Sequence, residues 1–95
     1  MSQSVKYNAV VTVLGKDRVG IIAGVTGVLA NLNINISDIS QTILKDMFTM
    51  IMLVDTMNST YDFDKIREEL KLLGEKMNLE IRIQHKEIFN AMQRI

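Results

Sequence analysis

The stretch Gly15-Lys-Asp-Arg-Val-Gly-Ile21 separates two segments whose apolar residues recur with different periods. Residues 5–14, before it, are rich in β-branched and aromatic side chains and are largely apolar on both parities, which predicts a central strand with both faces covered. After it, apolar side chains recur with helical spacing at Ile22, Val25, Leu29 and Leu32. We therefore predict a strand, this turn, and a helix over residues 19–32.

A strand-to-helix turn of this kind is the first place to look for a binding site. The start of a helix presents backbone N–H groups without intrahelical partners, together with the positive end of the helix dipole. Both features suit a carboxylate or a phosphate group. The helix also carries a stripe of glycines, Gly20, Gly24 and Gly27, and each interior glycine costs roughly 1 kcal/mol relative to alanine. A cost repeated along one stripe indicates close approach by the sheet or by a partner chain.

The middle of the chain predicts a β-hairpin. Residues 35–44 form its first strand, and the change of apolar parity near Ser37 and Asp38 indicates a bulge or kink there. The hairpin tip is Lys45-Asp46. Residues 47–55 are apolar at nearly every position, so the second strand of the hairpin is also expected in the centre of the sheet.

The C-terminal part of the chain predicts a long helix, a strand and a short helix. The helix covers residues 62–77, with Asp62 or Thr60 as its cap. Residues 79–84 alternate between apolar and polar side chains, as in a half-solvated edge strand. Residues 86–95 form a short helix that must dock on this domain or on a neighbour, because it has too little to bury alone.

This order predicts an α+β fold, the ferredoxin-like βαββαβ sandwich, with a four-stranded antiparallel sheet, two helices on one face and a short C-terminal helix. Residues 1–95 form one domain, in which residues 5–85 are the core and residues 86–95 the terminal helix. Right-handed crossovers place both long helices on the same face of the sheet. The other face is then too apolar for water, so we expect a homodimer that buries it.

Composition excludes several classes of function. The chain has 11 basic and 11 acidic residues, so no long-range field attracts nucleic acid or an anionic membrane. The absence of cysteine excludes disulfides and thiolate metal sites and is compatible with a cytoplasmic location. No signal peptide or membrane span is expected, since no apolar run approaches about 18 residues.

The turn, the glycine-bearing helix and Leu32-Asn-Ile-Asn-Ile36 together resemble an ACT domain, a small regulatory module of amino-acid metabolism. More narrowly, Asp38-Ile-Ser-Gln-Thr42 and Phe48-Thr-Met50 are similar to the stand-alone single-ACT proteins of prokaryotes, which are similar to the ACT units of the glycine-cleavage-system transcriptional repressor. The resemblance covers nearly all of the chain. It implies an amino acid bound at a dimer interface, between the turn after the first strand and the start of the second strand of a neighbouring copy.

The resemblance also implies individual ligand contacts. Asp17 falls where serine-responsive ACT domains use an asparagine, Gly20 matches the glycine at the helix start, and Asn35 matches the asparagine that opens the second strand. The position of a ligand-contacting histidine is Gly15 in this chain, so the resemblance does not identify the ligand.

Physical chemistry assigns the same turn to the carboxylate of an amino acid. Backbone N–H groups at Val19, Gly20 and Ile21 can hold this carboxylate, and the missing side chain at Gly20 permits close approach. For the other charge, Asp17 and the amide of Asn35 can receive the ammonium group.

Each polar candidate has a simpler interpretation. Asp17 is a common helix N-cap, and Asn35 suits the turn that follows a helix. Arg18 can reach an acidic ligand, but an exposed arginine in a loop is more often solvated. His85 does not belong to a cluster of Cys, Asp or Glu residues and is expected at the surface. No cluster of histidines or cysteines predicts a metal site.

The leading hypothesis is a non-enzymatic homodimeric sensor without a cofactor, which binds a small amino acid and passes its occupancy to a partner protein. A small acylphosphatase-like enzyme is one alternative, in which Arg18 and Asn35 imitate a phosphate cradle and a water-orienting amide. A purely structural dimerisation module is another. Direct RNA binding by the sheet is disfavoured, since it needs exposed aromatic side chains and the central strands offer only Tyr7 and Phe48.

Overall fold

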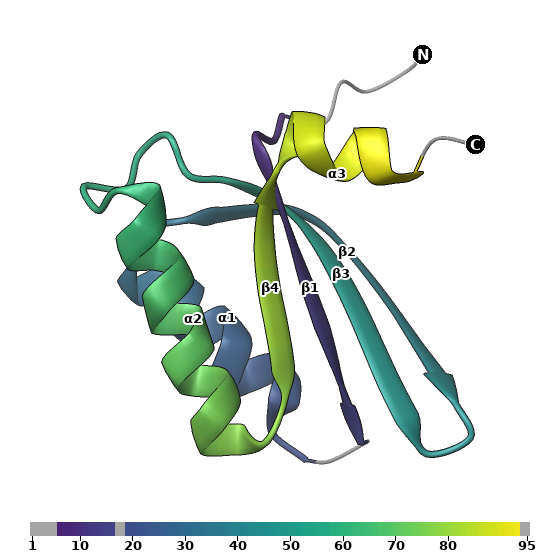
Figure 1. Ribbon diagram of the computed structural model, residues 1–95. Helices are drawn as coiled ribbons and strands as arrows, with labels where there is room; N and C mark the ends of the chain where they lie inside the picture. The colour runs from purple at the N-terminus through teal and green to yellow at the C-terminus, as the bar shows by residue number, and fades with distance from the viewer. Residues whose placement is uncertain (1–5, 17–18, 94–95) are drawn as a thin grey trace.

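The computed structural model describes residues 6–16 and 19–93. The elements in this part are β1 (Ala9–Lys16), α1 (Ile21–Asn31), β2 (Asn35–Leu44), β3 (Met47–Asp55), α2 (Phe63–Met77), β4 (Glu80–His85) and α3 (Lys86–Gln93). The strands form one antiparallel sheet in the order β2-β3-β1-β4, and α1 and α2 cover one of its faces (Figure 1). The predicted α+β, ferredoxin-like βαββαβ fold is confirmed.

The core lies between this face and the two long helices. Alternate residues of the central strands β1 and β3 point toward the helices, and these positions are buried. The core cluster contains Val11, Val13, Met50, Met52, Val25, Leu29, Ile66 and Leu70. No polar or charged side chain is buried in the described part of the chain, so aliphatic residues and methionines fill the interior.

The strand β1 begins and ends later than predicted. Its expected start at residue 5 is wrong, because Asn8 instead fixes the loop after β3: the Asn8 Nδ2 donates to Thr56 Oγ1, and the Thr56 N–H donates to Asn8 Oδ1, each at 3.0 Å. At its other end β1 continues to Lys16, which pairs with Met47. The strand thus reaches the end of the sheet where the hairpin tip lies.

Local sequence signals predicted the hairpin and the start of α2. The register of β2 against β3 shifts between Ile36 and Asp38, which confirms the bulge. Lys45 at the hairpin tip has a φ of 59°, in the left-handed region. Asp62 is the N-cap of α2, since its carboxylate accepts a hydrogen bond of 2.8 Å from the Lys65 N–H.

The start of α1 differs from the prediction. Gly20 is the N-cap and has a φ of 93°, a conformation that cannot continue into a helix, so α1 begins at Ile21 rather than Val19. Of the other glycines in the stripe, a Cβ at Gly24 would lie 2.8 Å from Met77 Sδ, so its close neighbour is a side chain of α2 and not the expected sheet or partner chain. A Cβ at Gly27 would have nothing within 4 Å, so the chain itself gives no reason for that glycine.

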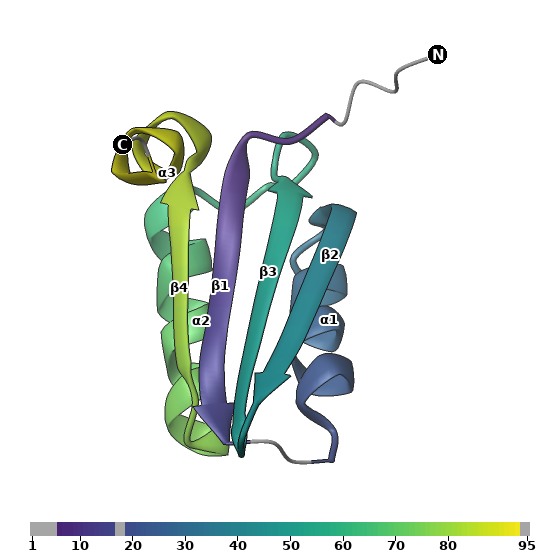
Figure 2. The same cartoon turned by 90° about the vertical axis from the view of Figure 1, so that its right-hand side faces the viewer.

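The second face of the sheet is not covered by α1 or α2 (Figure 2). The helix α3 lies at one end of this face, where Gln84 Nε2 donates to Met92 Sδ at 3.2 Å and Val10 is buried. Toward the hairpin tip, the apolar side chains of Leu14 and Met47 stay exposed. The expectation that a second copy covers this face stays a prediction.

Candidate functional site

The start of α1 offers hydrogen-bond donors that no side chain of the described residues caps. The Gly24 N–H donates to the Gly20 carbonyl at 2.8 Å and closes the first turn of the helix. The N–H groups of Ile21, Ile22 and Ala23 come before this bond and have no acceptor within the helix. Together with the positive end of the helix dipole, they form a place where a carboxylate can bind.

These donors open into a groove of about 280 Å³ between α1 and the edge strand β2. The groove is lined by Gly20, Ile21, Ile22, Ala23, Gln41, Ile43 and Phe48. Among the described residues of this lining, Gln41 supplies the sole polar side chain and none is charged. An uncharged wall next to three free donors suits a small ligand that has one anionic group and an apolar or small side chain.

The sequence did not identify Gln41 as part of this groove. The bulge shifts the register of β2, so that Gln41 pairs with Met50 and Ile43 with Phe48, both of which point toward the helices. Side chains alternate between the two faces of a sheet, so counting alternate residues along β2 from the predicted bulge would have placed Gln41 on the α1 side.

On the strand side of the turn, Gly15 and Lys16 line a second hollow of about 540 Å³ together with Met47 and Asn78. Lys16 is exposed and supplies the positive charge in this hollow. The turn that the sequence singled out therefore lies between two concave surfaces, of which only the one at α1 contains uncapped helix donors.

Three predicted ligand residues lie together at the start of α1. Val19 is fully exposed, Gly20 is exposed, and Ile21 buries its side chain in the core. Asp17 and Arg18 lie outside the described residues.

Asn35 lies at the opposite end of the sheet. Gly15 and Ile43 both pair with Phe48 of β3, whereas Asn35 pairs with Asp55. Asp55 is seven positions beyond Phe48 along β3, which at about 3.4 Å per position is roughly 24 Å. Within one chain, Asn35 therefore cannot reach a ligand held at the start of α1.

Other kinds of site have little support in the described residues. Within the ranges 6–16 and 19–93, no three His, Asp or Glu side chains lie close enough together to hold a metal ion. His85 is exposed and stacks on Phe63 with ring centroids 3.8 Å apart. None of the helices in these ranges is both long and apolar enough to span a membrane.

The sequence matches a known domain family over most of its length. The family profile described as "ACT domain" matches residues 8–84. A UPF0237 protein of Clostridium acetobutylicum is 54% identical over 87 residues, which cover 92% of this chain and 98% of that relative.

Solved structures give the same result. An ACT domain protein from Streptococcus pneumoniae superposes with a TM-score of 0.77 at 42% identity, covering 93% of this chain and 96% of that chain. A proposed glycine cleavage system transcriptional repressor superposes with a TM-score of 0.73 at 26% identity, covering 83% of this chain and 45% of that chain.

Proposed function

The chain belongs to the ACT-domain family, and on that premise we propose that it is a regulatory protein without enzymatic activity that binds a small amino acid at a homodimer interface. ACT domains are typically regulatory and bind small ligands. In this proposal a partner protein responds to occupancy of the site, because the ligand binds the partner-bound and the partner-free state of this protein with different affinities. We place this regulation in the cytoplasm.

The observation that carries the proposal is the uncapped start of α1 beside the uncharged groove. The carboxylate of an amino acid is held by the N–H groups of Ile21, Ile22 and Ala23, and its side chain packs on the apolar wall. The ammonium group needs acceptors. Gln41 and Asp17 of the chain that holds the carboxylate can supply two of them, and Asn35 of a second copy can supply the third.

A second copy is needed because Asn35 lies at the far end of the sheet from α1. The edge of β2 is free in one chain, and Ile39 and Ile43 are exposed on its α1 side. An exposed apolar edge strand readily pairs with another chain. When two copies pair antiparallel along β2, the start of one β2 strand moves toward the α1 N-terminus of the other.

The outer surface of α1 also favours contact with a second copy beside β2. The helix has no charged residue, and its exposed positions include Ile22, Ala23, Gly27 and Ala30. By contrast, the exposed surface of α2 carries ion pairs such as Lys65–Glu69. A solvated helix normally places charged residues outward, so we infer that the outer surface of α1 is covered in the dimer.

A screen of the twenty amino acids by thermal unfolding tests ligand binding. At 100 times its dissociation constant, the true ligand is expected to stabilise the protein by about 2.7 kcal/mol. For a domain of this size, this corresponds to a rise in Tm of roughly 10 °C or more. Protein concentration is held constant, because the Tm of a dimer depends on it. If no amino acid raises the Tm at millimolar concentration, the amino-acid proposal is wrong.

The oligomeric state tests the proposed interface. Gly27→Glu is expected to convert the dimer into a monomer, because it places an unpaired charge in the contact between two α1 helices. The fold of each chain should survive, since nothing lies within 4 Å of a Cβ at this position. Light scattering at micromolar concentration gives the mass, and circular dichroism checks the fold.

Leu14→Glu is the matched variant on the open face of the sheet, where Leu14 is exposed. The sequence led us to expect a second copy on this face, but the proposed pairing along β2 leaves the face open, so we expect this variant to remain a dimer. If Leu14→Glu dissociates while Gly27→Glu does not, the second copy covers the open face of the sheet and not the edge of β2. A monomeric wild type at the same concentration would exclude the homodimer altogether.

The acylphosphatase-like alternative is disfavoured by the position of Asn35. That mechanism needs the amide close to the first strand-to-helix loop of the same chain, but the register places Asn35 at the opposite end of β3. A purely structural dimerisation module differs from the sensor only in its lack of ligand response, so the amino-acid screen also distinguishes these two functions.

A further inference from the structure

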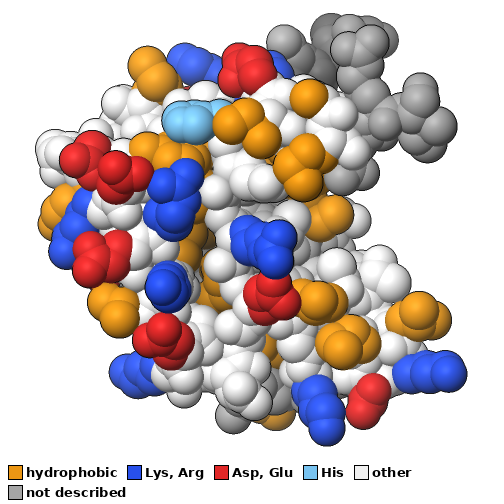
Figure 3. Space-filling model, viewed as in Figure 1, with side chains coloured by type: hydrophobic (Ala, Val, Ile, Leu, Met, Phe, Trp, Pro, Cys, Tyr) orange, Lys and Arg blue, Asp and Glu red, His pale blue; other side chains and the backbone are white. Residues whose placement is uncertain are grey.

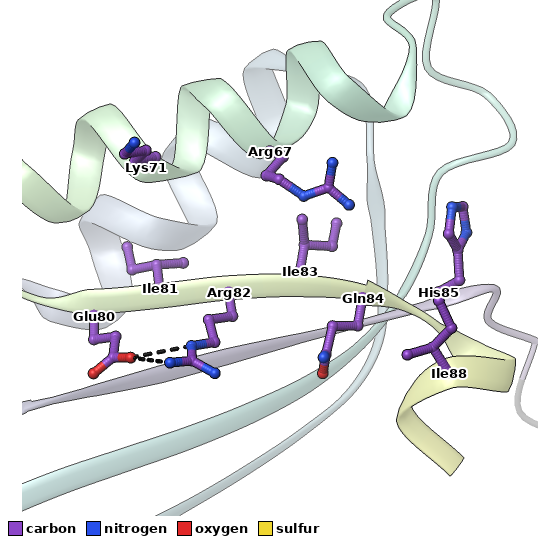
Figure 4. Close-up of a pocket in the computed structure, with 9 residues that line it drawn as sticks. All are labelled: Arg67, Lys71, Glu80, Ile81, Arg82, Ile83, Gln84, His85 and Ile88. Carbon is purple, nitrogen blue, oxygen red and sulfur yellow. Dashed lines mark hydrogen bonds and ion pairs between the residues drawn. The ribbon is translucent and has the colours of Figure 1, made fainter. Parts of the chain in front are cut away.

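A further groove in the described part of the chain lies far from the start of α1. It has a volume of about 510 Å³ and runs along the outer edge of β4, beneath α2. Figure 3 shows this furrow with apolar side chains along its floor and Lys or Arg side chains at its rim. Its lining residues are Arg67, Lys71, Glu80, Ile81, Arg82, Ile83, Gln84, His85 and Ile88 (Figure 4).

The edge of β4 has free backbone hydrogen-bonding groups. β4 is an end strand of the sheet and pairs only with β1. The Lys86 N–H donates at 2.9 Å to the carbonyl of Asn8, the residue just before β1. Because ladder bonds alternate along an antiparallel strand, the N–H groups of Ile81, Ile83 and His85 point away from β1 and into the groove.

The groove is positively charged, although the chain as a whole is neutral. Three cations line it, Arg67, Lys71 and Arg82, against the single carboxylate of Glu80. Glu80 is already bonded to Arg82, with Oε2 accepting from Nη2 at 2.6 Å and from Nε at 3.0 Å. Arg67 is likewise paired with Asp64, with Nη1 donating to Oδ1 at 2.9 Å, whereas Lys71 has no ion-pair partner among the described residues. The unbalanced charge is therefore that of Lys71, on the α2 side of the groove.

The spacing of these cations fits an extended chain. Arg67 and Lys71 are four residues apart on α2, so their Cβ atoms are roughly 6 Å apart. Residues i and i+2 of a strand lie on the same face and are roughly 6.7 Å apart. A strand added beside β4 thus presents every second side chain to Arg67 and Lys71 in turn.

We propose that the edge of β4 and the helix α2 dock an extended segment of a partner protein, which adds as a fifth strand and carries acidic residues at alternate positions. Its backbone bonds to the outward groups of Ile81, Ile83 and His85, and its carboxylates face Arg67 and Lys71. The aliphatic parts of its acidic side chains pack on Ile81 and Ile83. This surface is remote from the groove at α1, so the inference does not depend on an amino-acid ligand.

Fluorescence anisotropy with a labelled peptide tests the proposal on the full-length protein. The probe is fluorescein-Thr-Glu-Val-Glu-Val-Glu-Thr, and the control peptide has glutamine in place of each glutamate. We expect the acidic peptide to bind, the glutamine peptide to bind about tenfold more weakly, and added salt to weaken the acidic complex. Amide hydrogen exchange should slow at Ile81, Ile83 and His85 when the acidic peptide is bound.

Two lysine variants with the same change of net charge provide the control. Lys71→Glu is expected to weaken binding of the acidic peptide about fivefold or more. Lys65→Glu, on another side of α2, should change it less than about twofold. Lys65 bonds to Glu69, which raises the pKa of Lys65, so Lys65→Glu also breaks a helix ion pair, whereas Lys71→Glu breaks none among the described residues.

Four results would overturn the proposal. One is the absence of binding by the acidic peptide, and another is equal weakening by both lysine variants. A third is binding without slower exchange at the β4 amides, which would mean that no strand is added. The fourth is a lower oligomeric mass for Lys71→Glu without peptide, since the edge of β4 would then contact a second copy of this chain.

Discussion

Gly20→Val is expected to abolish the thermal response to the amino acid that stabilises the wild type most. Gly20 has a φ of 93°, and a β-branched residue in this region costs on the order of 1–3 kcal/mol. The strain turns the N–H groups at the start of α1 away from the ligand, and the added side chain stands at the mouth of the groove. The full stabilisation of about 2.7 kcal/mol at 100 times the dissociation constant should therefore disappear. Asp17→Ala is expected to abolish the same response by removing an acceptor for the ammonium group.

The control for lost stability is Ile83→Val, a buried substitution in β4 that costs roughly 0.5–1.5 kcal/mol. This variant is less stable than the wild type but should keep the ligand-induced rise in Tm. Light scattering should find Gly20→Val and Asp17→Ala still dimeric. If both variants respond like the wild type, the turn is only the start of a helix and the ligand, if one binds, is held elsewhere.

Leu70→Ala is expected to destabilise the protein by roughly 2–5 kcal/mol, which corresponds to a fall in Tm of roughly 10–30 °C. Leu70 is 1% exposed and packs in the core between α2 and the sheet. Removing its side chain loses the burial of apolar surface and leaves a cavity that the neighbouring side chains fill only in part. Urea unfolding followed by circular dichroism measures the change in the free energy of unfolding.

The matched control is Leu72→Ala, two residues away on the same helix. Leu72 is 51% exposed, so the expected change is within about 0.5 kcal/mol. The change in helix propensity is the same for both variants and cancels in the comparison. Equal losses of stability at the two positions would contradict the orientation of α2 on the sheet.

The arrangement of the candidate ligand residues makes dimerisation a condition of binding. One chain supplies uncapped donors and an apolar wall, but its own Asn35 is roughly 24 Å from the level of the turn. In our proposal, a variant that breaks the dimer therefore also loses the ligand response. Gly27→Glu can be examined both by light scattering and by thermal unfolding. The loss of the dimer and the loss of the ligand response should occur together.

Periodicity predicted the elements well because each one buries a single stripe or face. In β3, Phe48, Met50, Met52 and Val54 alternate with less buried residues and all point into the core. Turn and cap chemistry was equally informative, since Asp62 caps α2 as predicted. These signals arise from neighbouring residues in the chain and need no knowledge of distant contacts.

The same local signals misplaced the start of α1. The helical spacing of the apolar residues led us to begin this helix at Val19. The left-handed conformation of Gly20, which periodicity does not reveal, makes Ile21 the first helical residue. Gln41 was missed for a related reason, because its face depends on where the bulge shifts the register against β3.

By itself, the sequence determined the order of strands and helices, the apolar character of both central strands and the family to which the chain belongs. Periods of two and 3.6 residues, caps and turns are properties of short stretches. Only the tertiary structure decided that Asn35 and the turn lie at opposite ends of the sheet and that Arg67 and Lys71 line the free edge of β4. Such placements depend on strand register and helix packing, which join residues far apart in the chain.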